Sequence, residues 1–166
     1  MISWVMNVKH NIKLKQLIIA ILVPLAVGGA AAFLTRDSMI IFDAVRKPPL
    51  APPRWVFPVA WTALYILMGV CSYLVWASDA SAPRKDRALS LYGMQLAVNF
   101  LWSFLFFALQ MYLASFLWLL LLWVLVAVTI ALFYHISRSA GKLMIPYLLW
   151  LTFAAYLNLG VYILNR

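Results

Sequence analysis

The stretch of sequence that decides the fold is residues 112–134, YLASFLWLLLLWVLVAVTIALFY. It contains no Asp, Glu, Lys, Arg or His, and a helix needs about 20 mostly apolar residues to cross a membrane. Four further stretches meet the same two conditions, residues 16–34, 55–77, 88–107 and 143–164. The sequence therefore predicts an all-α integral membrane protein in which five transmembrane helices form a single domain over residues 1–166.

The composition of the whole chain leads to the same class of protein. Of its 166 residues, 67% are hydrophobic and only 10% are charged, whereas about a quarter of the residues of a soluble domain are charged. The net charge is +9, but the basic residues lie between the apolar stretches, as expected for short loops beside anionic lipid headgroups. This distribution argues against nucleic-acid binding and makes the lipid bilayer the expected surroundings.

The first apolar stretch has two interpretations. Lys9, Lys13 and Lys15 precede it and it ends in three alanines at 30–32, a pattern that resembles a secretory signal peptide. Its apolar run is longer than a usual signal core, which favours a helix that is retained.

The connection between the first two helices, residues 35–54, is the longest and has an unusual composition. It combines charged and apolar residues with prolines at positions 48, 49, 52 and 53. Such a loop should fold back as a stiff lid on the end of the bundle, because proline lowers the entropy lost on ordering. Arg46, Lys47, Arg54 and Trp55 would stand at the mouth beneath it.

The distribution of Lys and Arg predicts the orientation in the membrane. Eight lie on the N-terminal side and five on the lid side, and the side richer in Lys and Arg is usually cytoplasmic. We expect a multi-pass protein of a bacterial cell membrane, with the N-terminus in the cytoplasm and the lid and C-terminus outside.

Three helices carry stripes of aromatic and polar residues at a spacing of three or four, which places each stripe on one helix face. The stripes are Trp61, Tyr65, Met68, Ser72 and Trp76; Gln95, Asn99, Trp102 and Phe106; and Tyr147, Trp150, Ala154, Leu157 and Asn158. Amides that face lipid without a partner cost several kcal/mol, so the amide-bearing faces should point into the bundle. In one interpretation the amides form hydrogen bonds between helices and the indoles are packing residues. In the other, the indoles leave a flat-walled pocket. The spacing alone allows both.

Small residues at Gly93 and Ala97 form a second surface on the third helix, roughly opposite the Asn99 face. Such a pair lets another helix approach closely. That helix belongs either to the same chain or to a second protomer, and we expect a homodimer.

The stretch from Lys47 to Tyr65, KPPLAPPRWVFPVAWTALY, resembles the TspO/translocator protein family, also called the tryptophan-rich sensory proteins. The resemblance continues through QLAVN at 95–99, WS at 102–103 and FF at 106–107, and ends with Pro146-Tyr147, Trp150, FA at 153–154 and LN at 157–158. Two positions in the lid depart from the family pattern: Leu50 stands where Trp is usual and Phe42 where Tyr is common. These departures bear on lid closure and ligand preference.

The resemblance implies a five-helix bundle, often dimeric, with a ligand pocket under the first loop. The family binds porphyrins such as protoporphyrin IX, benzodiazepine-type drugs and, in animal members, cholesterol. Carried over by motif, the pocket positions are Trp61, Asn99, Trp102, Trp150, Ala154 and Leu157. Trp61 and Trp150 match tryptophans implicated in light-dependent porphyrin breakdown by some bacterial members.

The leading hypothesis is therefore a binding and sensory protein for a flat tetrapyrrole, with no cofactor or metal required. One alternative is a light- and oxygen-dependent porphyrin-degrading enzyme in which Trp61 and Trp150 are the reactive residues. A second is transport of a porphyrin or sterol, although ion-coupled carriers usually keep ionisable residues at membrane depth and the five apolar stretches contain none. Leu159, Tyr162 and Arg166 fit a loose sterol-binding pattern. Tyr and Arg at a helix end are also common anchors at the membrane–water interface.

Overall fold

A computed structural model describes residues 13–38 and 43–166 of the chain. Its elements are α1 (Leu14–Thr35), α3 (Val56–Trp76), α4 (Ala82–Ser103), the π-helical turn η1 (Phe104–Ala108), α5 (Tyr112–Ile136), α6 (Arg138–Leu143) and α7 (Ile145–Leu164). Helix α4 continues into η1, and α6 continues into α7. With these pairs counted as single spans, the described residues contain five spans that are long and apolar enough to cross a membrane. The predicted all-α, five-helix membrane fold is confirmed.

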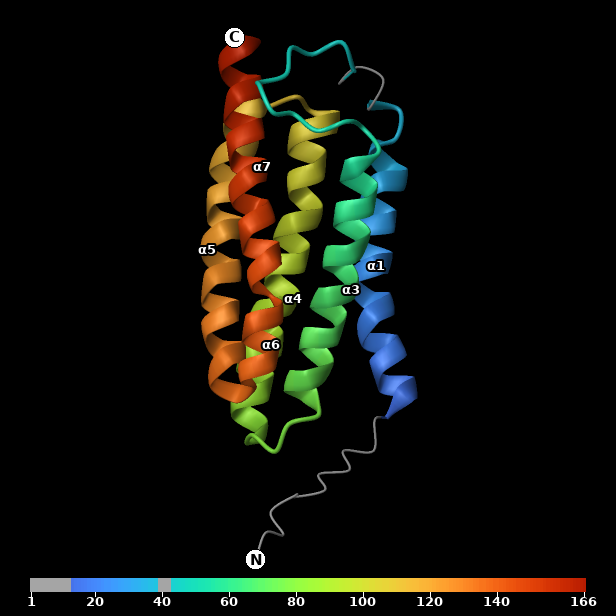
Figure 1. The fold of residues 1–166 in the computed structure, drawn as a ribbon, viewed down its shortest axis with the longest axis vertical. Coiled ribbons are helices and arrows are strands. Elements are labelled where there is room, and N and C mark those ends of the chain that lie inside the picture. Colours follow the sequence, from blue (N-terminus) through green and yellow to red (C-terminus); the bar gives the residue numbers. More distant parts are fainter. Residues whose placement is uncertain (1–12, 39–42) are drawn as a thin grey trace, which may run out of the picture.

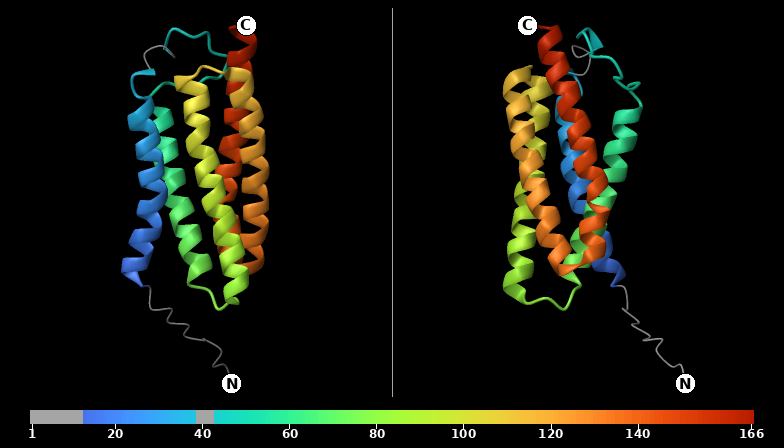
Figure 2. Two further views of the ribbon diagram at one scale, coloured as in Figure 1. Left: turned by 180° about the vertical axis from the view of Figure 1, so that it is seen from behind. Right: turned by 60° about the vertical axis from the view of Figure 1, so that its left-hand side comes forward.

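The spans form one elongated bundle (Figure 1). The described part of α1 starts at one end, and the C-terminus of α7 lies at the other end, beside the loop that joins α1 to α3 (Figures 1 and 2). Helix α1 packs on α3 and α4, while α5 packs on α4 and α7.

Helix α1 approaches α3 closely because glycines face the contact. A Cβ atom added to Gly69 would lie 2.4 Å from the Cα of Ile21, and one added to Gly28 would lie 2.0 Å from the ring of Tyr65. Small residues permit such backbone approach between membrane helices, where lipid supplies no hydrophobic driving force. Helix α1 is thus an integral part of the bundle.

Most helix boundaries lie within two residues of the sequence-based prediction, but the third and fifth spans begin six and five residues earlier than predicted. The third helix begins at Ala82 rather than 88, so the helix includes Arg84 and Arg87 from the predicted loop. The prediction used the limits of the apolar run, but a helix can project past the apolar span. Pro83 lies in the first turn of α4, where proline is well tolerated.

The fifth span also begins earlier than residue 143. The short helix α6 precedes α7, with Ser137 as its N-cap, whose side chain accepts a hydrogen bond from the backbone N–H of Ala140. A serine cap of this kind can satisfy an amide that the helix itself leaves free. The polar residues 138–142 of α6 lie outside the apolar pattern on which the prediction rested.

Candidate ligand-binding site

A cluster of aromatic rings fills the space between α3 and α7 on the lid side of the bundle. The backbones of these two helices approach less closely than those of α3 and α1. Trp61 lies at the centre: its ring centroid is 5.5 Å from that of Tyr65, 6.4 Å from Trp102, 6.3 Å from Tyr147 and 6.4 Å from Trp150. Aromatic pairs at these separations attract one another, so the rings join α3 to α4 and α7 through their contacts with Trp61.

The cluster continues toward the lid and toward α4. Trp102 stacks on Phe106 with centroids 5.3 Å apart, and Phe57 meets the edge of Trp150 at 6.2 Å. Phe153 packs against Trp150 at 5.8 Å. The three indoles singled out by spacing are thereby brought together in one aromatic layer, and in this structure they occupy its centre by packing on each other.

A chain of buried hydrogen bonds forms the floor of this layer. Tyr65 Oη donates to Asn99 Oδ1 (3.2 Å), Asn99 Nδ2 donates to Tyr147 Oη (2.7 Å), and Tyr147 Oη donates to Gln95 Oε1 (3.0 Å). Gln95 Nε2 lies 3.7 Å from the sulfur of Met68. Gln95 and Asn99 are almost completely buried, so the expected inward orientation of these amides is observed, and both amide atoms of Asn99 are engaged within the protein.

A second polar cluster fixes Trp102. Its indole Nε1 donates to Asn158 Oδ1 at 3.2 Å, and Ser115 Oγ lies 3.1 Å from the same oxygen. Asn158 Nδ2 donates to the backbone oxygen of Tyr112 at 2.8 Å. Asn158 therefore serves as a link between α4, α5 and α7, as the hypothesis of interhelical hydrogen bonding expects.

Trp150 differs from Trp102 in one respect. Its Nε1 is buried and has no hydrogen-bond partner, although buried indole N–H groups usually find one. Leaving such a donor unpaired costs about 1–3 kcal/mol. The unpaired donor lies in the same ring cluster as Trp61, where a ligand with an acceptor atom could supply the missing bond.

The loop between α1 and α3 is fastened to α7 above this layer. The backbone N–H of Arg46 donates to Asn165 Oδ1 (3.0 Å), and Asn165 Nδ2 donates to the backbone oxygen of Arg46 (2.8 Å). Tyr156 Oη donates to the backbone oxygen of Pro49 (2.7 Å). Pro48 is buried, and a Cβ added to Gly160 would lie 2.5 Å from its Cβ.

Two basic residues of the loop, Arg54 and Lys47, contact Asp43. Arg54 Nη1 donates to Asp43 Oδ2 at 2.6 Å, and Lys47 Nζ donates to the backbone oxygen of Asp43 at 3.2 Å. Trp55 is 67% exposed. Of the two departures from the family pattern, Phe42 lies outside the described residues, while Leu50 is 83% exposed with a φ of 67°.

The remaining residues singled out from the sequence lie in several places. Phe106, Ala154 and Leu157 are buried. Leu159 and Tyr162 are partly buried near the lid end of α7, and Arg166 is exposed. Gly93 and Ala97 are exposed on α4, and a Cβ added to Gly93 would meet nothing within 4 Å. A homodimer through this surface stays a prediction.

Sequence reasoning missed the residues of α7 that hold the lid, namely Tyr156, Gly160 and Asn165. The spacing of Tyr156 and Gly160 by four residues places them on one helix face, which was the available signal. The partners are backbone atoms of a distant loop, and sequence patterns do not reveal such pairs. Phe57 was also missed, because it precedes the stripe that begins at Trp61.

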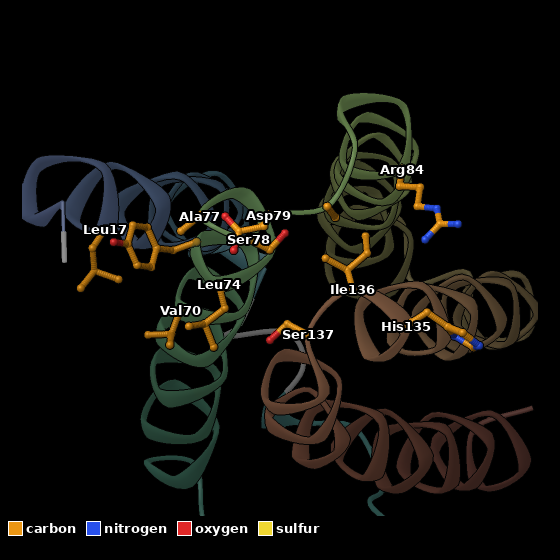
Figure 3. A pocket seen from close by; sticks show the side chains of 12 residues that line it. Leu17, Val70, Leu74, Ala77, Ser78, Asp79, Arg84, His135, Ile136 and Ser137 are labelled. Carbon is orange, nitrogen blue, oxygen red and sulfur yellow. The ribbon is translucent and has the colours of Figure 1, made fainter. Parts of the chain in front are cut away.

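A cavity of about 640 Å³ lies at the end of the bundle opposite the lid. Figure 3 shows residues from α3, α4 and the end of α5 around it, with Leu17 of α1 at its edge. A second, largely apolar cavity of about 320 Å³ lies nearby between α1, α3 and α4. Across the described part of the chain, no three His, Cys, Asp or Glu side chains gather as a metal site would require.

These features define a multi-pass helical membrane protein with an aromatic layer between its helices and a loop docked over one end. Comparison with known proteins makes this class specific: residues 20–164 match the TspO/MBR family, and the chain belongs to that family. It is 41% identical to the tryptophan-rich protein TspO of Archaeoglobus fulgidus over 151 residues, which cover 90% of this chain and 97% of that protein.

Relatives from other organisms are also similar to this chain over most of their length. The tryptophan-rich sensory protein of Cereibacter sphaeroides is 39% identical over 75% of this chain and 76% of its own length. The human translocator protein is 35% identical over 78% of each chain. The family resemblance read from the sequence motifs is confirmed.

Proposed function

We propose that the aromatic layer beneath the lid binds a flat apolar tetrapyrrole such as protoporphyrin IX, and that the protein is a membrane-embedded binding and sensory protein. The observation that carries this proposal is the buried, unpaired Nε1 of Trp150 within a ring cluster centred on Trp61. Planar indole faces suit stacking on a planar ring, and the free N–H provides one polar contact to orient it.

The binding step requires the rings to part. Trp61 stacks on Tyr65 at 5.5 Å and meets Trp150 edge-on at an interplanar angle of 83°. These ring–ring contacts are each worth about 0.5–1.5 kcal/mol, so a ligand that replaces them with larger planar contacts can insert. Propionate groups would meet the basic residues of the lid, where Arg46 is exposed and Arg54 would have to share its pairing with Asp43.

The test is a fluorescence and absorbance titration of the full-length protein with protoporphyrin IX in darkness. The double variant Trp61→Phe with Trp150→Phe should bind about tenfold more weakly, because it loses indole area and the free donor. The matched control is Trp76→Phe with Trp123→Phe, which removes two exposed indoles outside the cluster. Equal curves for the double variant and the unmodified protein would reject this site.

The same samples then test the degradation hypothesis. Loss of porphyrin that requires both light and oxygen, and that is slower in the double variant than in the control, would support a photochemical role for Trp61 and Trp150. Loss at the same rate without protein would remove it.

A further inference from the structure

The cavity opposite the lid has an apolar depth and a charged rim. Leu17, Val70 and Leu74 line one side, whereas Arg84 of α4 and His135 of α5 lie on the other side, apart from each other (Figure 3). Val70 precedes the end of α3 at Trp76 by six residues, which corresponds to about 9 Å along a helix. A cavity with an apolar interior and a charged opening suits an amphiphile better than a molecule that is wholly polar or wholly apolar.

The rim carries one acid and one permanent cation that do not neutralise each other. Asp79 and Arg84 both line the cavity, and neither forms an ion pair with any residue in 13–38 or 43–166. His135 uses Nδ1 to contact the backbone oxygen of Ala131 at 2.7 Å. The rim therefore offers one site for a negative group and one for a positive group.

This cavity is separate from the aromatic layer. Met68, which is fully buried, lies on α3 between Tyr65 of the layer and Val70 of the cavity, and the floor of the aromatic layer is held by the hydrogen bonds of Tyr147. Occupation of one site does not require occupation of the other, so the inference is independent of the proposed porphyrin binding.

We propose that this cavity binds a phospholipid whose headgroup carries a primary ammonium, of the phosphatidylethanolamine type. An acyl chain lies against Leu17, Val70 and Leu74, the phosphate pairs with Arg84, and the ammonium donates to Asp79. A choline headgroup has a positive charge but no N–H to donate, and a glycerol headgroup has no positive charge. The combination of an acid and an arginine on one rim therefore selects for the amine.

The surrounding charge is a competing influence. The described residues at this end include Lys13, Lys15, Lys85, Arg87, Arg138 and Lys142 in addition to Arg84. These cations attract anionic lipids to the whole surface. They do not line the cavity, so they raise the local concentration of anionic lipid without explaining a specific bound one.

The experiment is lipid titration of the detergent-solubilised full-length protein, read by native mass spectrometry. Phosphatidylethanolamine, phosphatidylcholine and phosphatidylglycerol with identical acyl chains are compared. One molecule of the ethanolamine lipid per chain should bind about fivefold more tightly than either of the others, as expected for one partly exposed charge-assisted contact.

Variants locate the site. Asp79→Asn should remove the preference for ethanolamine over choline, whereas Asp86→Asn, a nearby acid outside the cavity, should keep it. Arg84→Gln should weaken the ethanolamine and choline lipids alike, and Arg87→Gln should not. Equal binding of the three lipids, tightest binding of phosphatidylglycerol, or identical effects of Asp79→Asn and Asp86→Asn would each overturn the proposal.

Discussion

Replacing Tyr147 by Phe should lower the free energy of unfolding by about 1–3 kcal/mol while leaving the helices in place. The change removes only the hydroxyl, which accepts from Asn99 Nδ2 at 2.7 Å and donates to Gln95 Oε1 at 3.0 Å. Hydrogen bonds between membrane helices are worth about 0.6 kcal/mol on average and up to 1.7. Two lost bonds give the stated range, and the ring stays because Phe fills the same volume.

The loss should be larger than for an ordinary tyrosine because both partners are buried. Gln95 is 0% exposed and Asn99 1%, so neither amide can turn to water when the hydroxyl is gone. A buried polar atom left without a partner costs more than the bond was worth. The control is Tyr134→Phe, since Tyr134 is 42% exposed on α5 and should change stability by less than about 0.5 kcal/mol.

Reversible unfolding in mixed micelles of dodecylmaltoside and dodecyl sulfate, followed by circular dichroism, measures both variants. A double-mutant cycle with Asn99→Leu sharpens the result, because the two changes remove the same bond and should be non-additive. If Tyr147→Phe were no more destabilising than Tyr134→Phe, or if the cycle were additive, the continuous hydrogen-bonded floor would be refuted.

Three further changes test how the lid and α1 are held. Gly69→Ala should destabilise the protein by about 1–3 kcal/mol in the same unfolding assay, because the added Cβ would meet the backbone of α1. The control Gly29→Ala places its Cβ in open space and should be neutral. Equal effects of the two changes would contradict the close contact between α1 and α3. Leu50→Asn should stabilise the protein by about 0.5–1 kcal/mol, since asparagine tolerates a positive φ that costs leucine about 1 kcal/mol. Leu50→Ala should give no gain in stability. An equal gain from alanine would exclude backbone strain as the cause. Tyr156→Phe should speed tryptic cleavage of the lid about fivefold by removing a bond worth about 1 kcal/mol; unchanged cleavage would mean that this bond does not hold the lid.

The number and class of the helices could be predicted because uninterrupted apolar runs leave few other structures in lipid. Their ends could not be placed as well. At Ala82 and Arg138 the helices extend into charged turns, where capping and chain direction decide the boundary, and hydropathy carries no information about either.

The interior faces could be predicted for a similar reason. Gln95, Asn99 and Asn158 had to point inward because lipid offers amides no partner, and the helical spacing carried Trp102 and Trp150 with them. The spacing could not say which groups pair. The structure gives Trp102 a partner in Asn158 and leaves Trp150 without one, a distinction that depends on how the two stripes meet across the bundle.

The buried floor also separates binding from passage. A pathway through the bundle would have to cross the layer where Met68, Gln95 and Tyr147 are at most 1% exposed and where Tyr147 joins α4 to α7 by two hydrogen bonds. Opening it means breaking those bonds in a medium that cannot replace them. The lid, by contrast, is held by a few contacts at the bundle end, with Asn165 exposed to water. Entry and exit of the proposed ligand on the lid side would therefore cost less than passage through the bundle, which favours the proposed binding role over transport.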